Sequence, residues 1–94
     1  MDITGHQVEQ LHDPTGIIEG ERYEFFLDLD IDEEDELYTE GGVRLRVLYA
    51  VRDGREWIAA YDFIGAATGE VLGFALEDDE EEEVNAYCRA HLGE

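Results

Sequence analysis

The sequence contains neither lysine nor serine, and it has one cysteine and one proline in 94 residues. The absence of serine removes the nucleophile-elbow motif of serine hydrolases, and we find no phosphate-binding loop and no dinucleotide fingerprint. The single cysteine, Cys88, excludes a disulfide within the chain. No motif forces a catalytic chemistry, so we expect a protein that is not an enzyme and binds no cofactor.

Positive charge is also scarce: 26 acidic residues stand against six arginines, for a formal net charge of −20. Such a surface repels phosphate groups, so we expect no binding to nucleic acid and none to an anionic membrane. It attracts cations and basic proteins. Hydrophobic residues make up 44% of the chain, which is too many for a disordered acidic segment, so we expect a folded domain.

No apolar run approaches the ~18 residues of a membrane span, and the N-terminal residues lack the basic and apolar regions of a signal peptide. The expected location is therefore the cytoplasm. The 94 residues suit a single domain, residues 1–94, with one modest hydrophobic core.

Two stretches, residues 21–31 and 43–52, alternate apolar and polar residues with the period of a half-buried strand. An antiparallel register with Ile31 opposite Val43 brings the apolar residues together on one face. It also pairs opposite charges across the strands, Asp30 with Arg44 and Asp28 with Arg46.

Asp53-Gly54 predicts the next turn, and two registers of the following strand compete. A two-residue turn sets Tyr49 opposite Ile58 and Asp62 opposite Leu45, which puts a carboxylate on the apolar side. A three-residue loop, with Gly54 left-handed in a bulge, keeps Asp62 out of the core. We therefore predict the second register, whose facing pairs are Tyr49 with Trp57, Val47 with Ala59, Leu45 with Tyr61, Val43 with Phe63, and Arg44 with Asp62.

The remaining elements complete a meander. Residues 3–12 predict a weak first strand that ends in a turn at 13–16, and Val71–Leu76 predict a short last strand. From Glu77 onward, acidic residues followed by an apolar stripe predict a helix. The stripe consists of Val84, Tyr87, Cys88, His91 and Leu92. The fold class is α+β, an antiparallel meander sheet of about five strands with a C-terminal helix packed on one face.

Two runs, Gly16–Tyr38 and Phe74–Cys88, carry a resemblance to known sequences. They are similar to a small family of acidic proteins of unknown function from spore-forming Gram-positive bacteria, whose members have about this length. Some of those members carry the label pullulanase. The resemblance assigns no functional residues. A starch-debranching enzyme of that kind works from a barrel of ~250 residues, so we expect no such activity in this chain.

Fifteen of the acidic residues lie in two runs, eight within residues 28–40 and seven at 77–83. The first run is similar in spacing to a calcium-binding loop, but the positions that need Gly and Glu hold Glu33 and Thr39. The second run exceeds what the start of a helix favours. We expect no metal site, and we expect partner binding by Asp32, Glu33, Glu34, Asp35, Glu36, Glu80, Glu81, Glu82 and Glu83.

An apolar row is predicted on the polar face of the sheet, made of Phe26, Leu48 and Ile58. We expect the N-terminal hairpin to cover it, because small domains seldom leave contiguous apolar rows bare. The alternative is an exposed patch for a partner or for a second copy of the chain. The sequence thus leaves the oligomeric state open, and a homodimer is one outcome it allows.

Cys88 and His91 share one face of the predicted helix, and His6 or His12 could join them only if the first strand folds back beside it. Two residues of the common ligand types are weak evidence for a metal. The interpretation we favour is a buried thiol and a histidine near the end of the helix.

Charge concentration favours a non-catalytic adaptor or modulator that engages a basic surface on another protein. One alternative is that the acidity adapts the domain to stay soluble in high salt and encodes no partner. Another is a calcium-responsive module.

Overall fold

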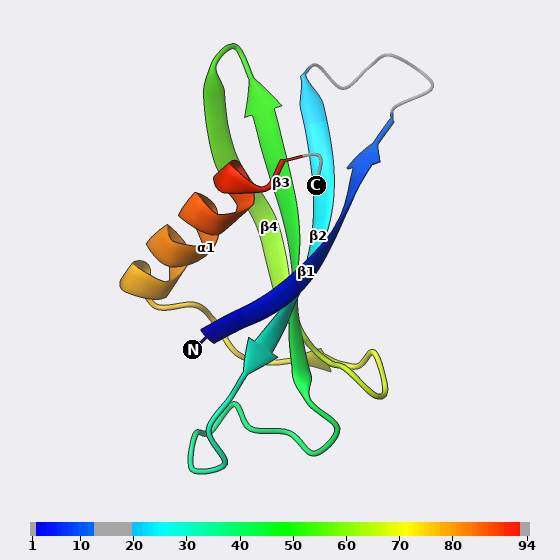
Figure 1. The fold of residues 1–94 in the computed structure, drawn as a ribbon, viewed down its shortest axis with the longest axis vertical. Coiled ribbons are helices and arrows are strands. Elements are labelled where there is room, and N and C mark those ends of the chain that lie inside the picture. Colours follow the sequence, from blue (N-terminus) through cyan, green and yellow to red (C-terminus); the bar gives the residue numbers. More distant parts are fainter. Residues whose placement is uncertain (1, 13–19, 93–94) are drawn as a thin grey trace.

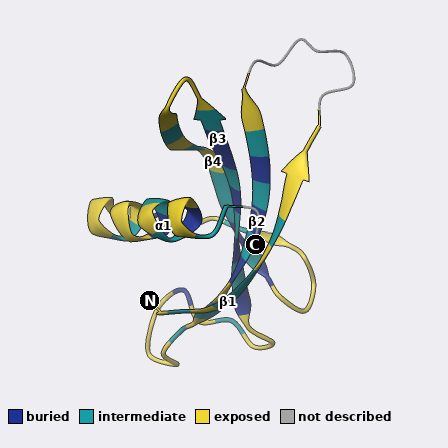
Figure 2. Ribbon diagram, turned by 45° about the horizontal axis from the view of Figure 1, so that its top comes forward, coloured by how far each residue is buried: buried dark blue, intermediate teal, exposed yellow. Residues whose placement is uncertain are grey.

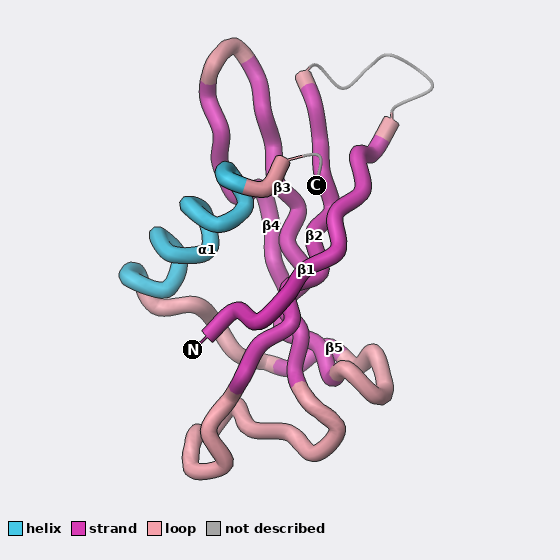
Figure 3. Tube along the Cα trace, in the orientation of Figure 1, coloured by secondary structure: helices cyan, strands magenta, loops and turns pink. Residues whose placement is uncertain are grey.

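The computed structural model of the chain describes residues 2–12 and 20–92. Five antiparallel strands follow one another in sequence order across one sheet, and one helix lies against it (Figures 1 and 3). The elements are β1 (Asp2–Leu11), β2 (Glu21–Asp30), β3 (Val43–Arg52), β4 (Arg55–Gly65), β5 (Val71–Leu72) and α1 (Asp78–Ala90). The predicted α+β meander with a C-terminal helix is confirmed. The predicted turn at 13–16 lies outside the described residues.

The core lies between α1 and one face of the sheet. Alternate residues of β2 and β3 are buried, as the dark bands on these strands show (Figure 2). Val84 and Cys88 bury the inner side of the helix, because they lie four positions apart on one helical face. The largest fully buried side chains of the described residues are Phe25, Leu27, Leu45, Val47, Tyr49, Phe63, Val84 and Cys88.

The predicted register between β2 and β3 is wrong by two residues. Leu29, not Ile31, lies opposite Val43, and Asp28 lies opposite Arg44. A shift of two residues leaves every side chain on its own face, so the alternating pattern could not detect it. Residues 31–42 are instead used in a loop that buries Leu37 against the core.

The predicted three-residue loop between β3 and β4 is also wrong. Asp53 and Gly54 form a two-residue turn with φ angles of 51° and 76°, the left-handed geometry that such hairpins need. The register then shifts by one residue between Tyr49 and Leu48, which leaves Ala59 as a bulge inside β4. The pairs that follow are Val47 with Tyr61, Arg46 with Asp62, and Leu45 with Phe63. Because the bulge at Ala59 shifts the register by one residue, the turn can have two residues and Asp62 still faces outward.

The last strand is shorter than predicted, because β5 ends at Leu72. The chain then leaves the sheet and carries Leu76 into the core. The Leu76 N–H donates a hydrogen bond to the Tyr61 hydroxyl at 2.8 Å. This crossing brings the start of α1 to a hollow that it shares with the loop after β2.

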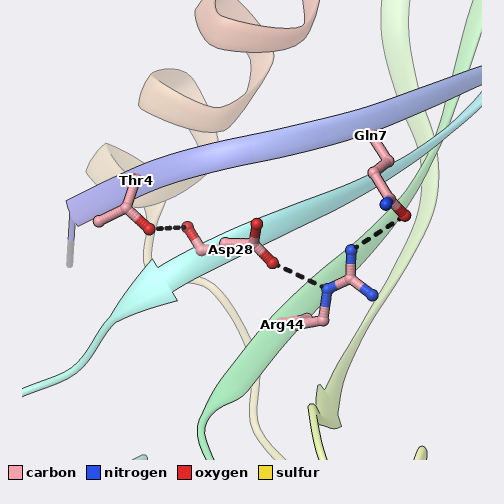
Figure 4. A network of polar contacts seen from close by, with 4 residues as sticks. All are labelled: Thr4, Gln7, Asp28 and Arg44. Carbon is pink, nitrogen blue, oxygen red and sulfur yellow. Dashed lines mark hydrogen bonds and ion pairs between the residues drawn. The ribbon is translucent and has the colours of Figure 1, made fainter.

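Charged residues on the outer face of the sheet are joined in a network (Figure 4). Arg44 donates to the Asp28 carboxylate at 2.9 Å and to the Gln7 side chain at 3.3 Å. The Thr4 hydroxyl donates to the Asp28 carbonyl at 3.3 Å. The network links β1, β2 and β3 across the face that α1 does not cover.

Candidate interaction surfaces

The first acidic run forms a loop that is folded by two of its own carboxylates. Asp35 Oδ1 accepts a hydrogen bond from the Leu37 N–H at 3.0 Å, and Asp32 Oδ1 accepts one from the Glu34 N–H at 3.3 Å. Such turns are the usual use of Asp in loops. Leu37 fastens the loop to the core and is 9% exposed. Glu33, Glu34 and Glu36 are exposed.

The second acidic run forms the first half of α1. Glu77 is the N-cap residue, and its N–H donates to Glu80 Oε1 at 3.0 Å. The side chains of Asp78, Asp79, Glu81, Glu82 and Glu83 are exposed and make no hydrogen bond or ion pair within the described part of the chain. Acids of the first turn also favour the helix dipole, but Glu82 and Glu83 lie beyond that turn. The helix therefore carries more negative charge than its N-terminal capping and its dipole account for.

The two acidic runs lie next to each other at one place, where residues of both line a cleft of about 210 Å³. Asp35 and Glu36 line it from the loop, and Glu77 and Glu80 line it from the start of α1. Phe74 adds an apolar wall and is 41% exposed. Two sites that the sequence suggested separately are therefore neighbours, and we call this hollow the acidic cleft.

A second hollow of about 440 Å³ lies along α1, between the helix and β4. Trp57 and Ile58 line it from β4, and Asp78, Glu81, Glu82 and Asn85 line it from the helix. Trp57 is 40% exposed. We call this hollow the β4 groove. The prediction named Glu81 and Glu82 as partner-binding residues, but it missed Trp57, because the wrong turn register placed that side chain on the core face.

The predicted apolar row is wrong as a unit. Phe26 and Leu48 lie half-buried on the outer face, where the Arg44 guanidinium sits 5.0 Å from the centre of the Phe26 ring. Ile58 lies opposite Tyr49 and packs against the core on the other face, as the two-residue turn requires. Nor does the N-terminal hairpin cover this face, because β1 extends the sheet beside β2.

The histidines and the cysteine of the possible metal site do not gather into one. β1 does pass beside the end of α1, where His6 Nδ1 lies 2.8 Å from the Tyr87 hydroxyl and the His6 and His91 rings are 4.7 Å apart. Burial raises the pKa of Cys88 to about 12, so its thiol is neutral at physiological pH. Within residues 2–12 and 20–92, no three His, Cys, Asp or Glu side chains are grouped so that they could hold a metal ion.

The helix of the described structure is too short and too polar to cross a membrane. In the described residues, the sheet, one helix and two hollows lined by acidic residues define a small α+β protein. The chain belongs to a family of unknown function, DUF6509, whose match covers residues 1–94. Comparison with curated proteins and with solved structures gave no match.

Proposed function

We propose that the protein is a non-catalytic cytoplasmic adaptor that binds a basic surface of another protein through the acidic cleft. The observation that supports this is the convergence of Asp35 and Glu36 with Glu77 and Glu80 around a single hollow. The resemblance to proteins of spore-forming bacteria suggests where such a partner would be sought.

The cleft combines two kinds of contact that a basic partner could use. Its four carboxylate side chains line one hollow, so their electric fields add there. The exposed ring of Phe74 offers apolar area and a face for a lysine or arginine side chain. Charge provides a fast association, and the aromatic wall provides the contact that salt does not screen.

The test is affinity capture from the source organism's lysate at low salt, with a scrambled acidic domain as the control column. A partner retained only by the protein is then compared on two double variants. Glu36→Gln with Glu77→Gln removes two of the four negative charges of the cleft, and Glu9→Gln with Glu70→Gln removes the same charge elsewhere. We expect the cleft pair to weaken binding about fivefold, and the control pair to change it less than about twofold.

Binding should also weaken steeply between low and physiological salt. Equal losses in both double variants would contradict the cleft as the site. Retention of the same generic basic proteins on both columns would instead support acidity as a solubility trait.

A further inference from the structure

β4 has an open hydrogen-bonding edge. It pairs with β3 along its length, whereas β5 pairs with it only at Phe63 and Ile64. Within the described residues, the edge of residues 55–62 that faces away from β3 pairs with no other strand. Open edges are templates on which another extended segment can add as a strand.

The β4 groove runs beside this edge. In Figure 1, α1 lies on the side of β4 away from β3 and extends beyond the sheet. Figure 2 shows the same arrangement from another angle, with the exposed half of the helix pointing away from the sheet. A strand added to β4 would therefore lie along the helix side that carries Asp78, Glu81 and Glu82.

One residue that lines the groove, Asn85, carries a buried polar atom without a partner in the described chain. Asn85 Oδ1 has almost no accessible surface and accepts no hydrogen bond within the described chain. A buried acceptor of this kind costs stability until a donor reaches it. Trp57 also lines this groove and is 40% exposed, and tryptophan is the best aromatic side chain for binding a cation.

We propose that the β4 groove binds an extended segment of a partner protein, rich in lysine and arginine, which adds to β4 as a further strand. Its backbone pairs with the open edge, and its basic side chains face Asp78, Glu81 and Glu82. The site is separate from the acidic cleft, so this inference goes beyond the proposed function and does not depend on it.

The geometry limits the length of the segment. The bulge at Ala59 interrupts the regular edge, so the uninterrupted stretch is Arg55–Ile58. We therefore expect the added strand to pair over about four residues. A second copy of this chain is the poorer occupant, because each copy carries a net charge of −20 and its strands would bring further carboxylates to the helix.

The test uses a labelled synthetic peptide of alternating lysine and valine, with a fully N-methylated peptide of the same charge as its control. Binding to the full chain is followed by fluorescence anisotropy at low salt. We expect N-methylation to weaken binding at least about tenfold, because it removes the backbone donors of the added strand. We also expect slower amide exchange along residues 55–58 when the unmodified peptide is bound.

Two variants of equal charge locate the peptide. Glu81→Gln with Glu82→Gln should weaken binding about fivefold, whereas Glu33→Gln with Glu34→Gln, in the other run, should change it less than about twofold. All four positions are exposed, and an unchanged unfolding midpoint by circular dichroism confirms that the variants fold.

Several outcomes would overturn the inference. Equal binding of the N-methylated peptide, or equal losses in both variants, means that charge alone holds the peptide. Loss of binding only with Glu36→Gln and Glu77→Gln would place the peptide in the acidic cleft. That result would support the proposed function and rule out strand addition at β4. A dimer in sedimentation that excludes the peptide from β4 would show that a second copy is the occupant.

Discussion

The two acidic runs have similar composition but different structural roles. In the loop after β2, Asp32 and Asp35 accept hydrogen bonds from the backbone and one leucine fastens the segment to the core. In α1 the backbone is satisfied by helical hydrogen bonds, and five of the seven acids have no partner within the described residues. The first run uses two of its carboxylates to stabilise its own loop, whereas five acids of the second run make no contact within the described residues that stabilises the helix.

The difference shows that a count of acidic residues does not locate a binding surface. A carboxylate that already accepts a hydrogen bond from the backbone of its own loop is less available to a partner than a carboxylate on the exposed side of a regular helix. Neutralising the two runs should therefore have opposite effects on stability, and the variants below test this contrast.

Leu37→Ala should have the largest effect, because it removes the anchor that fastens the loop to the core. Leu37 is buried among the core residues, so truncation should lower the free energy of unfolding by about 2–4 kcal/mol. Chemical denaturation measures this change. Tyr38→Ala is the matched control, since Tyr38 is 44% exposed and should cost less than about 0.5 kcal/mol. Equal costs for both would contradict the anchoring role.

The second run lies on α1, and the packing of this helix makes the stability of the protein depend on pH through Cys88. The pKa of this thiol rises from 9.0 to about 12 in the folded protein, because burial disfavours the thiolate. The thiol is neutral in both states below about pH 9, so it has no effect there. Between about pH 9 and 12 only the unfolded state loses the proton, so stability falls as pH rises.

This decline can be measured by thermal unfolding between pH 8 and 11. At pH 10 the thiol should account for about 1 kcal/mol of the decline, and Cys88→Ala should remove that part. Burial also raises the pKa of Tyr49 and Tyr87, which remain in the variant, so a smaller decline persists. Curves of the same shape for both proteins would show that the thiol is not protected by burial.

Asp35→Ala should cost about 1 kcal/mol, because it leaves the Leu37 N–H without its side-chain acceptor. Glu82→Ala removes the same charge from the helix, where no described group depends on it, and relieves repulsion from its neighbours. Its free energy of unfolding should stay the same or rise slightly. Equal destabilisation by the two substitutions, measured in parallel urea titrations, would remove the distinction between the runs.

Much of the fold could be predicted because the alternation in β2 and β3 assigns each side chain to a face. Register was harder to predict, because a two-residue shift between these strands preserves every face. In β4 the sequence held two correct signals, the Asp53-Gly54 turn and the need to keep Asp62 out of the core. They conflicted only because the bulge was expected at Gly54, and the bulge at Ala59 satisfies both.

The surfaces beside the helix could be predicted only in part. Five of the nine acids named from the sequence line the acidic cleft or the β4 groove, namely Asp35, Glu36, Glu80, Glu81 and Glu82. Exposure of the runs was predictable because long runs of charge are seldom buried. Their grouping could not be foreseen, because it depends on the path between Leu72 and Glu77. Trp57 was missed because its position depends on the register after the Asp53-Gly54 turn. Phe74 was missed because its exposure depends on the path between Leu72 and Glu77.

The order of the strands has a consequence for how quickly the chain should fold. Each strand pairs with its neighbour in sequence, so most of the sheet forms by closing short loops, and such topologies fold fast for β proteins. The pairing of His6 with Tyr87 joins residues 81 positions apart and requires the completed sheet. We therefore expect the hairpins to form early and the helix to dock in the last step, when the first strand and the end of the chain come together.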